Sequence, residues 1–147
     1  METHTLQEFK EKFKVDELTI FKNDSWTWSV RPGQPTLGSC VLSLNRYALE
    51  MSELTEKEMK DLGKIIQTLE KLVKKTFNYN IMNYLMLMMV DHHVHYHVIP
   101  RFDSEREFEG LKWNDNGGPA LPVLGDNQHN TSPDILKKIQ SILLSKL

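Results

Sequence analysis

The sequence predicts a single α+β domain, built as an antiparallel sheet of about five strands with a long helix on one face. Several short segments alternate apolar and polar residues between turn-forming residues, which is typical of half-buried strands. In the stretch 55–77, apolar residues instead recur at helical spacing. A chain of 147 residues, 39% hydrophobic and 26% charged, can form one compact core but has no room for a second domain.

The first expected element is a helix over residues 5–14. Thr5 and Glu8 have the spacing of a capping box. The apolar residues that share one helical face are Leu6, Phe9 and Phe13. We expect this helix to add one apolar stripe to the packing and nothing more.

Three strands are expected next, over residues 18–21, 26–31 and 37–44. The run 22–25 forms a turn between the first two, and Pro32 to Pro35 interrupts the pattern before the third. Tryptophans at 26 and 28 lie on one face of the second strand. They indicate core or a subunit interface, with base stacking as the alternative.

The long helix is expected over residues 55–77, with a second capping box at Thr55 and Glu58. Its apolar face consists of Met59, Leu62, Ile66, Leu69, Val73 and Phe77. Lysines near its end suit the helix dipole better than they indicate nucleic-acid binding. Residues 81–90 then form an apolar run that is rich in methionine. Because its second half is apolar on both faces, we expect a central strand.

The predicted domain covers residues 1–147, with a core over about 15–102. Residues 103–131 show no sustained periodicity and are punctuated by glycine and proline, so a long loop or arm is expected there. Residues 132–147 predict a last helix, with Ser132 as its N-cap and Pro133 in its first turn.

Charge and cysteine content narrow the functional classes. The net charge of −2 and the pI of about 6.3 give no basic footprint for a nucleic-acid polymer or an anionic membrane. The longest apolar run, 84–90, is too short to span a bilayer. Cys40 cannot form an internal disulfide and no leader pattern opens the sequence, so we expect a cytoplasmic protein.

Four of the six histidines lie between Asp91 and Arg101. His93, His95 and His97 alternate with apolar or aromatic residues, so on a strand their imidazoles point to the same side. Histidine has an unperturbed pKa near neutrality, and a row of such rings can attack, donate protons and hold an anion. By the same parity His92 faces the other way.

Residues 93–99 resemble the His-φ-His-φ-His-φ-φ signature of the histidine triad (HIT) superfamily, in which φ is an apolar residue. The following Pro100 and Arg101 resemble its diadenosine polyphosphate hydrolase branch. The resemblance implies the HIT fold, a homodimer with adjoining sheets and a nucleotide hydrolase or transferase activity. It assigns His95 as the nucleophile that attacks a nucleotide α-phosphorus and forms a covalent nucleotidyl-histidine. His93 and His97 are then expected to orient phosphate oxygens and assist the leaving group.

The resemblance also implies residues that touch substrate. Many relatives open the third strand with Pro-Gly-His, where this sequence has Leu37, Gly38 and Ser39. A sugar-contacting asparagine of relatives is replaced by Arg31, which is equally well explained as a solvated charge at a strand end. A phosphate-contacting loop with glycine and glutamine is replaced by residues 88–92, so Arg101 is the nearest source of positive charge. We therefore expect Arg31, Gly38, Ser39 and Arg101 to bind substrate.

Two alternatives remain open at this point. A His-x-His strand can also hold zinc, with Asp91 or Ser39 as a weak further ligand, although the sequence shows no second ligand cluster. A nucleotide-binding or interaction protein with little turnover is the other, because several substrate-contacting positions differ from the family pattern. The expected partner is a small nucleotide, with no cofactor bound to the protein and Mg²⁺ brought by a polyphosphate substrate.

Overall fold

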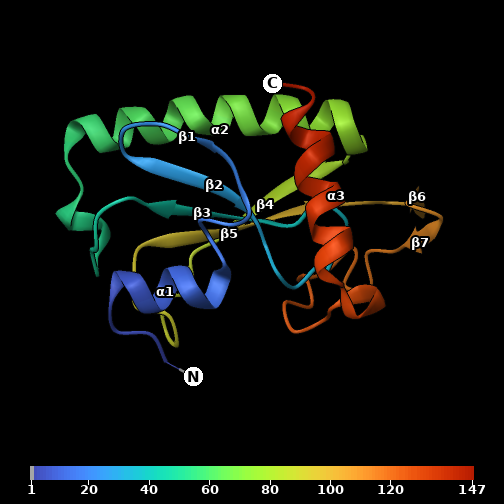
Figure 1. Ribbon diagram of the computed structural model, residues 1–147, viewed down its shortest axis with the longest axis horizontal. Helices are drawn as coiled ribbons and strands as arrows, with labels where there is room; N and C mark the ends of the chain where they lie inside the picture. Colours follow the sequence, from blue (N-terminus) through green and yellow to red (C-terminus); the bar gives the residue numbers. More distant parts are fainter. Residues whose placement is uncertain (1) are drawn as a thin grey trace.

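The computed structural model describes residues 2–147, so Met1 of the predicted domain lies outside the described residues. Five strands form one antiparallel sheet in the order β1-β2-β3-β5-β4 (Figure 1). The strands are β1 (Thr19–Lys22), β2 (Trp26–Val30), β3 (Cys40–Leu44), β4 (Ile81–Leu85) and β5 (His95–Arg101). The predicted α+β class and the five-stranded sheet are confirmed.

Three helices surround this sheet, and each begins at a residue that caps it. They are α1 (Leu6–Phe13), α2 (Glu56–Phe77) and α3 (Pro133–Leu144). The hydroxyls of Thr5, Thr55 and Ser132 each accept a hydrogen bond from a backbone N–H in the first turn. Figure 1 shows α2 along one side of the sheet and α1 on the other, while α3 packs across β1, β2 and α2.

The side of the sheet under α2 holds the main hydrophobic core. Trp26 and Trp28 are fully buried there, and Trp113 is buried in the same cluster. The Trp26 indole N–H donates to the Glu58 carbonyl at 2.8 Å, which satisfies its polar atom inside the core. The tryptophans are therefore core residues of the monomer.

The prediction of a central strand over residues 81–90 was wrong. Only Ile81–Leu85 is a strand, and it lies at the edge of the sheet, paired with β5 alone. Residues 86–90 leave the sheet and turn, so that the Met89 side chain is 80% exposed. The apolar run reflected exposed apolar residues in this turn and not a strand buried on both faces.

The stretch 103–131 has more structure than its sequence predicted. A short hairpin pairs β6 (Arg106–Phe108) with β7 (Leu111–Trp113), and a 3-10 turn follows at η2 (Gln128–Asn130). The hairpin turn requires positive φ at Glu109 and Gly110. Another 3-10 turn, η1 (Met51–Glu53), precedes α2.

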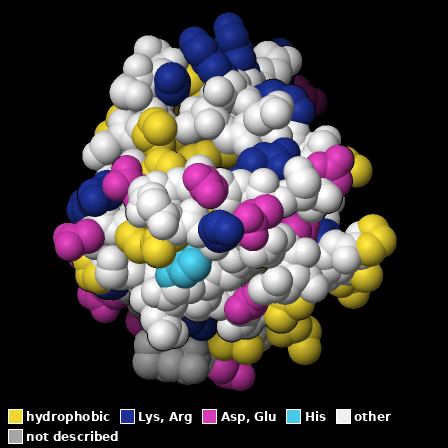
Figure 2. Space-filling model, turned by 90° about the vertical axis from the view of Figure 1, so that its right-hand side faces the viewer, with side chains coloured by type: hydrophobic (Ala, Val, Ile, Leu, Met, Phe, Trp, Pro, Cys, Tyr) yellow, Lys and Arg dark blue, Asp and Glu magenta, His cyan; other side chains and the backbone are white. Residues whose placement is uncertain are grey.

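Charge is mixed on the surface that carries the β6 and β7 hairpin. Figure 2 shows basic and acidic side chains interspersed over this side of the molecule, with scattered hydrophobic ones between them. Within residues 2–147, none of the helices has both the length and the apolar content that crossing a bilayer requires.

Candidate active site

The three histidines of the motif lie on one side of β5 and of residues 93 and 94, which precede it. His95 and His97 belong to β5 and lie opposite Ser43 and Val41 of β3, while His93 precedes the strand. The His95 and His97 rings are 5.0 Å apart between centroids and nearly perpendicular. The strand parity expected from the sequence therefore brings the three imidazoles together.

His95 has one ring nitrogen bonded to the backbone and one without a partner. Its Nδ1 lies 2.6 Å from the His93 carbonyl oxygen, and since a carbonyl only accepts, Nδ1 carries the proton. Its Nε2 is buried and has no hydrogen-bond partner. Burial lowers the pKa of His95, so the ring is neutral and its Nε2 keeps a lone pair.

His97 is held neutral by its neighbours. Burial is the main cause that lowers its pKa, to about 3, and the Arg31 guanidinium adds to this effect. Arg31 Nε donates to His97 Nδ1 at 3.2 Å, so Nε2 of His97 carries the ring proton. His97 can therefore donate a hydrogen bond to an anion, but it is a weak proton donor.

His93 uses both ring nitrogens on the backbone. Nε2 donates to the Leu44 carbonyl at 2.8 Å, and Nδ1 accepts from the Ala48 N–H at 3.3 Å. Tyr47 stacks on the ring, with centroids 5.4 Å apart. No nitrogen of His93 is left for a phosphate in this arrangement, while its own carbonyl orients His95.

The helix α1 covers the histidines with two phenylalanines. The Phe9 ring lies 5.0 Å from His93 and 4.9 Å from His95, and the Phe13 ring lies 5.9 Å from both His95 and His97. Phe9 and Phe13 form a second hydrophobic cluster with Val15 and Val41. The expectation that this helix only adds an apolar stripe was wrong, because its stripe lies directly on the histidines.

The segment before α1 is fastened to the loop before β5. The Thr3 N–H donates to the Val90 carbonyl at 3.1 Å, and the Thr3 hydroxyl donates to Asp91 Oδ1 at 3.1 Å. From α1 itself, Lys12 Nζ pairs with the same Asp91 oxygen at 2.8 Å. These contacts join α1 and the segment before it to the loop that carries Asp91.

Arg31 lies beside His97, the last histidine of the row. Besides His97, its guanidinium donates to the carbonyls of Gly33 and Leu124, at 2.9 and 3.2 Å. Burial lowers the pKa of Arg31, and the carboxylate of Asp91 opposes this shift. Of the residues expected to bind substrate, Arg31 is the one that contacts a histidine of the motif.

Gly38 and Ser39 are explained by local structure. Gly38 has φ of +86°, and a Cβ there would lie 2.8 Å from the Phe77 ring, so no other residue fits easily. The Ser39 hydroxyl is fully buried and donates to the Thr36 carbonyl at 2.8 Å. Neither residue contacts the three histidines of the motif.

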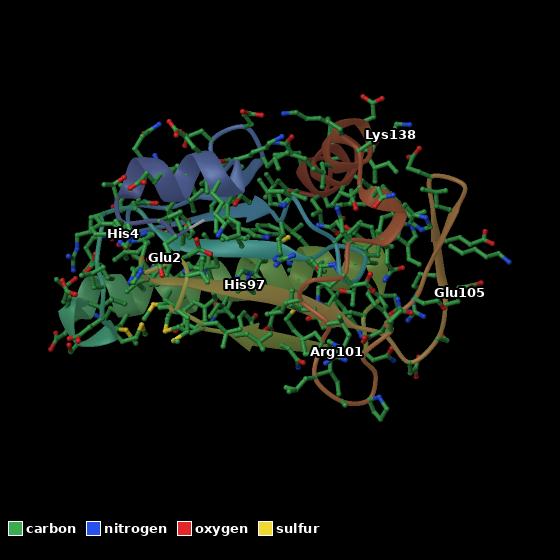
Figure 3. All side chains as sticks on the ribbon, turned by 90° about the horizontal axis from the view of Figure 1, so that it is seen from below. Glu2, His4, His97, Arg101, Glu105 and Lys138 are labelled. Carbon is green, nitrogen blue, oxygen red and sulfur yellow. The ribbon has the colours of Figure 1, made fainter. Side chains whose placement is uncertain are left out.

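Arg101 lies four residues beyond His97 on β5, and Figure 3 labels both side chains. Arg101 is paired through Nε and Nη2 with both oxygens of the buried Asp115, at 2.7 and 3.0 Å, and donates to Asn83 Oδ1 at 2.8 Å. A cavity of about 630 Å³ opens beside this pair, lined also by Asn80, Ile81 and Leu121. The cavity does not reach the histidines.

Sequence reasoning missed the groups that cover the site. Nothing in the spacing of Phe9 and Phe13 shows which surface they pack on, and the Lys12 to Asp91 pair joins residues 79 positions apart. The usable signal was the helical stripe together with an acidic residue next to the motif. Without a fold, these two features cannot be connected.

Solved structures of histidine triad proteins share this fold. A histidine triad protein of Sinorhizobium meliloti is 19% identical with a TM-score of 0.67, the match covering 99% of this chain and 98% of that one. A hypothetical histidine triad nucleotide-binding protein of Sulfolobus tokodaii is 14% identical with a TM-score of 0.66, covering 87% and 81%. The diadenosine triphosphate hydrolase of Plasmodium falciparum is 14% identical with a TM-score of 0.64, covering 87% and 74%.

None of the curated proteins matches the sequence. The model of the HIT domain family does match it, over residues 31–104. This range contains β3, α2, β4 and the whole histidine motif, and it is half of the chain. The chain therefore belongs to the HIT domain family.

Proposed function

We propose that this HIT protein is a nucleotide hydrolase or transferase that acts on a nucleotide α-phosphate, such as that of a dinucleoside polyphosphate or a nucleoside phosphoramidate. The observation that carries the proposal is the hydrogen bond from His95 Nδ1 to the His93 carbonyl. Because the ring proton is on Nδ1, Nε2 keeps a free lone pair. In the first step a bond forms between Nε2 and the α-phosphorus while the bond to the leaving group breaks. Water then attacks the phosphorus, the bond between phosphorus and Nε2 breaks, and the proton of the water passes to the solvent, which returns His95 to its neutral form.

The other residues receive roles that follow from their contacts. His97 Nε2–H, held in that tautomer by Arg31, would donate to a phosphate oxygen as charge develops. His93 is a positioning residue, because its carbonyl orients His95 and its ring pins the backbone of residues 44 and 48. Arg31 is the proposed source of positive charge. Gly38, Ser39 and Arg101 are less well placed to touch substrate, since each is occupied by local contacts.

The reaction requires α1 to move away from the histidines. Phe9 is fully buried against His95, whose Nε2 has no contact with solvent. A phosphorus atom must approach Nε2 along the line of its lone pair, which the closed arrangement prevents. The enzyme is thus expected to react from a minor open state, and its apparent affinity for nucleotide falls with the population of that state.

The same covering favours a second candidate, a nucleotide-binding or interaction protein with little turnover. Rapid quench with nucleotide labelled at the α-phosphate separates the two. The hydrolase should carry acid-labile label on a peptide that contains His95. His95→Ala should lose the label and at least about a thousandfold of turnover, because the group that forms the intermediate is gone.

His129→Ala is the matched control, since this exposed histidine lies outside the site. It should retain full labelling. His95→Ala must also be checked by circular dichroism, because the ring is fully buried and its loss leaves a cavity. Turnover by wild-type protein that never carries label would overturn the covalent mechanism. A folded wild type with neither label nor turnover would favour the second candidate.

We also propose that the protein forms a homodimer. The exposed side chains of Ile81, Leu87 and Met89 lie on the edge strand β4 and in the turn after it. An edge strand with one free side and exposed apolar neighbours is suited to pair with a second copy. Light scattering at micromolar concentration should give twice the mass of 17.2 kDa, and Met89→Asp should shift it toward the monomer. A monomer mass for the wild type would refute the proposal.

A further inference from the structure

The N-terminal segment and the loop before β5 lie side by side in parallel extended conformation. Thr3 forms a parallel bridge with Asp91, and the hydroxyl of Thr3 bonds to the Asp91 carboxylate. Successive side chains of an extended segment point to opposite sides. Glu2 and His4 therefore project together on the side away from Asp91, and His92, the next residue of the loop, joins them.

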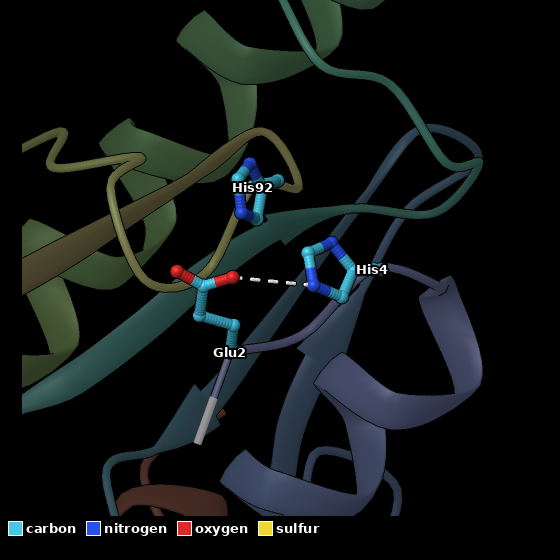
Figure 4. Close-up of side chains that lie close together, drawn as sticks. All are labelled: Glu2, His4 and His92. Atoms are coloured by element: carbon cyan, nitrogen blue, oxygen red, sulfur yellow. Dashed lines mark ion pairs between the residues drawn. The ribbon is translucent and has the colours of Figure 1, made fainter.

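The three side chains approach each other closely, as Figure 4 shows. Glu2 Oε2 lies 3.3 Å from His4 Nε2, and the His4 and His92 rings stack with centroids 4.9 Å apart. One ligand atom from each of the three lies within 4.8 Å of the others. Nε2 of His92 is buried and has no hydrogen-bond partner.

Two imidazoles and one carboxylate are a donor set of zinc, which takes nitrogen and oxygen ligands about 2.0 to 2.2 Å away. Ligands of a tetrahedral ion then stand roughly 3.3 Å from each other. The side chains of Glu2 and His4 are 61% exposed, so a small rotation can bring them to this spacing around the unpartnered Nε2 of His92. We propose that Glu2, His4 and His92 bind a divalent cation of the zinc class.

The histidines of the motif are poorly suited to the same role. His93 has both nitrogens bonded to the backbone, and His97, with Arg31 on Nδ1, carries its proton on Nε2. Nε2 of His95 is then the one bare nitrogen of the three rings. Within residues 2–147, the Glu2, His4 and His92 group is the one set of three potential ligands close enough to share an ion. The proposed site at Glu2, His4 and His92 is thus distinct from the His-x-His zinc site considered from the sequence.

Such a site would tie the segment that leads into α1 to the loop that leads into β5. Two of its ligands precede α1, and the third lies next to His93. Bound metal should therefore stabilise the closed position of α1 over His95. Metal binding itself does not depend on turnover, so the site can be tested whether or not the protein is a hydrolase.

The experiment is a calorimetric titration of the full chain with Zn²⁺, supported by the visible spectrum of the Co²⁺ form. We expect one equivalent of Zn²⁺ and the absorption of a four-coordinate Co²⁺ ion. His4→Gln and His92→Gln should each weaken binding at least about a hundredfold, more than loss of a group that only orients a ligand. Hydrogen exchange in residues 3–13 should slow when Zn²⁺ is added.

His129→Gln is the matched control and should bind as the wild type does. No binding in the wild type would overturn the proposal. So would binding that survives both His4→Gln and His92→Gln but is lost in His95→Gln, because the ion would then sit at the triad. Circular dichroism shows whether each variant is folded. The proposed function fails separately, through absence of label on His95 in protein stripped of metal.

Discussion

The same strands present apolar side chains on one face of the sheet and polar side chains on the other. Under α2, residues such as Trp28, Leu42 and Leu69 are fully buried and form one apolar core. Under α1, the strands β3 and β5 present His95, His97 and Ser43, and the apolar cluster there has four residues, one of them Val41 of β3 itself. The α2 face is a large apolar core, whereas the α1 face buries the imidazoles of three histidines under a small apolar cluster.

This difference predicts where the molecule opens. A buried polar atom without a partner costs roughly 1–3 kcal/mol, and each face has one, Nε1 of Trp28 under α2 and Nε2 of His95 under α1. The two faces therefore differ in the apolar contacts that keep them closed. The cover α1 is a helix of 8 residues with two buried side chains, while α2 is a helix of 22 residues with eight. Regions with few buried apolar contacts open locally at the lowest free energy. We therefore expect α1 to leave the sheet at a much lower free energy than α2.

The largest expected effect comes from breaking the weaker face. Phe9→Ala removes a fully buried ring from the cover of His95, and such a change costs about 3–5 kcal/mol. If about 3 kcal/mol of this falls on the closed position of α1, opening rises about a hundredfold. The rate at which diethylpyrocarbonate modifies His95, measured by mass spectrometry, should rise by the same factor.

Leu69→Ala is the control from the other face. This residue is also fully buried, and its loss should lower the free energy of unfolding by about 2–5 kcal/mol. Because α1 still packs normally, modification of His95 should change less than about threefold. Equal acceleration in both variants would show that His95 is exposed only by unfolding of the whole domain.

A second prediction sharpens the comparison through pH. The pKa values of His93, His95 and His97 are all lowered by burial, that of His97 to about 3. Below the unfolded pKa of about 6.5, the unfolded state binds protons that the folded state refuses. The stability that these neutral rings contribute is complete above that pH and is lost as pH falls toward the folded pKa.

Each buried histidine should therefore lower the free energy of unfolding by up to about 1.4 kcal/mol per pH unit below pH 6.5. Urea titrations between pH 7 and pH 5 measure the slope. His97→Gln should reduce it by the contribution of one proton. A flat profile in the wild type would mean that the histidines are accessible to protons in the folded state.

The sequence predicted where helices and strands occur better than it predicted which of them pack together. Periodicity and capping residues located α2 and α3, since both signals are local. The parity of the histidine motif correctly placed His95 and His97 together, because side-chain direction along a strand is also local. The position of β4 at the edge was missed, since an apolar run records composition and not which strands pair.

The cover of the site was missed for a related reason. Phe9 and Phe13 follow a pattern that fits any apolar surface, and the surface they cover is formed about 80 residues later by the histidines. The sequence allowed two interpretations of Arg31, a solvated charge or a site residue. Its contact with His97 decides between them. Long-range pairing of this kind is a property of the fold.

The smallest expected effect concerns the charged contact that holds α1. Lys12 Nζ lies 2.8 Å from Asp91 Oδ1, and the Asp91 side chain is 10% exposed. Lys12→Gln removes the charge while keeping most of the stem. A partly buried pair of this kind is worth about 1 kcal/mol, so hydrogen exchange of α1 amides such as that of Phe9 should accelerate about fivefold.

Lys10→Gln tests whether the partner matters or only the lysine. Lys10 lies on the same helix and pairs at 3.4 Å with Asp16, whose side chain is 77% exposed. Water screens that pair, so its loss should change exchange less than about twofold. If both variants accelerate exchange equally, the Asp91 contact does not hold α1, and the phenylalanines alone keep it on the histidines. If only Lys12→Gln does so, the closed site depends on a charge pair that high salt should also weaken.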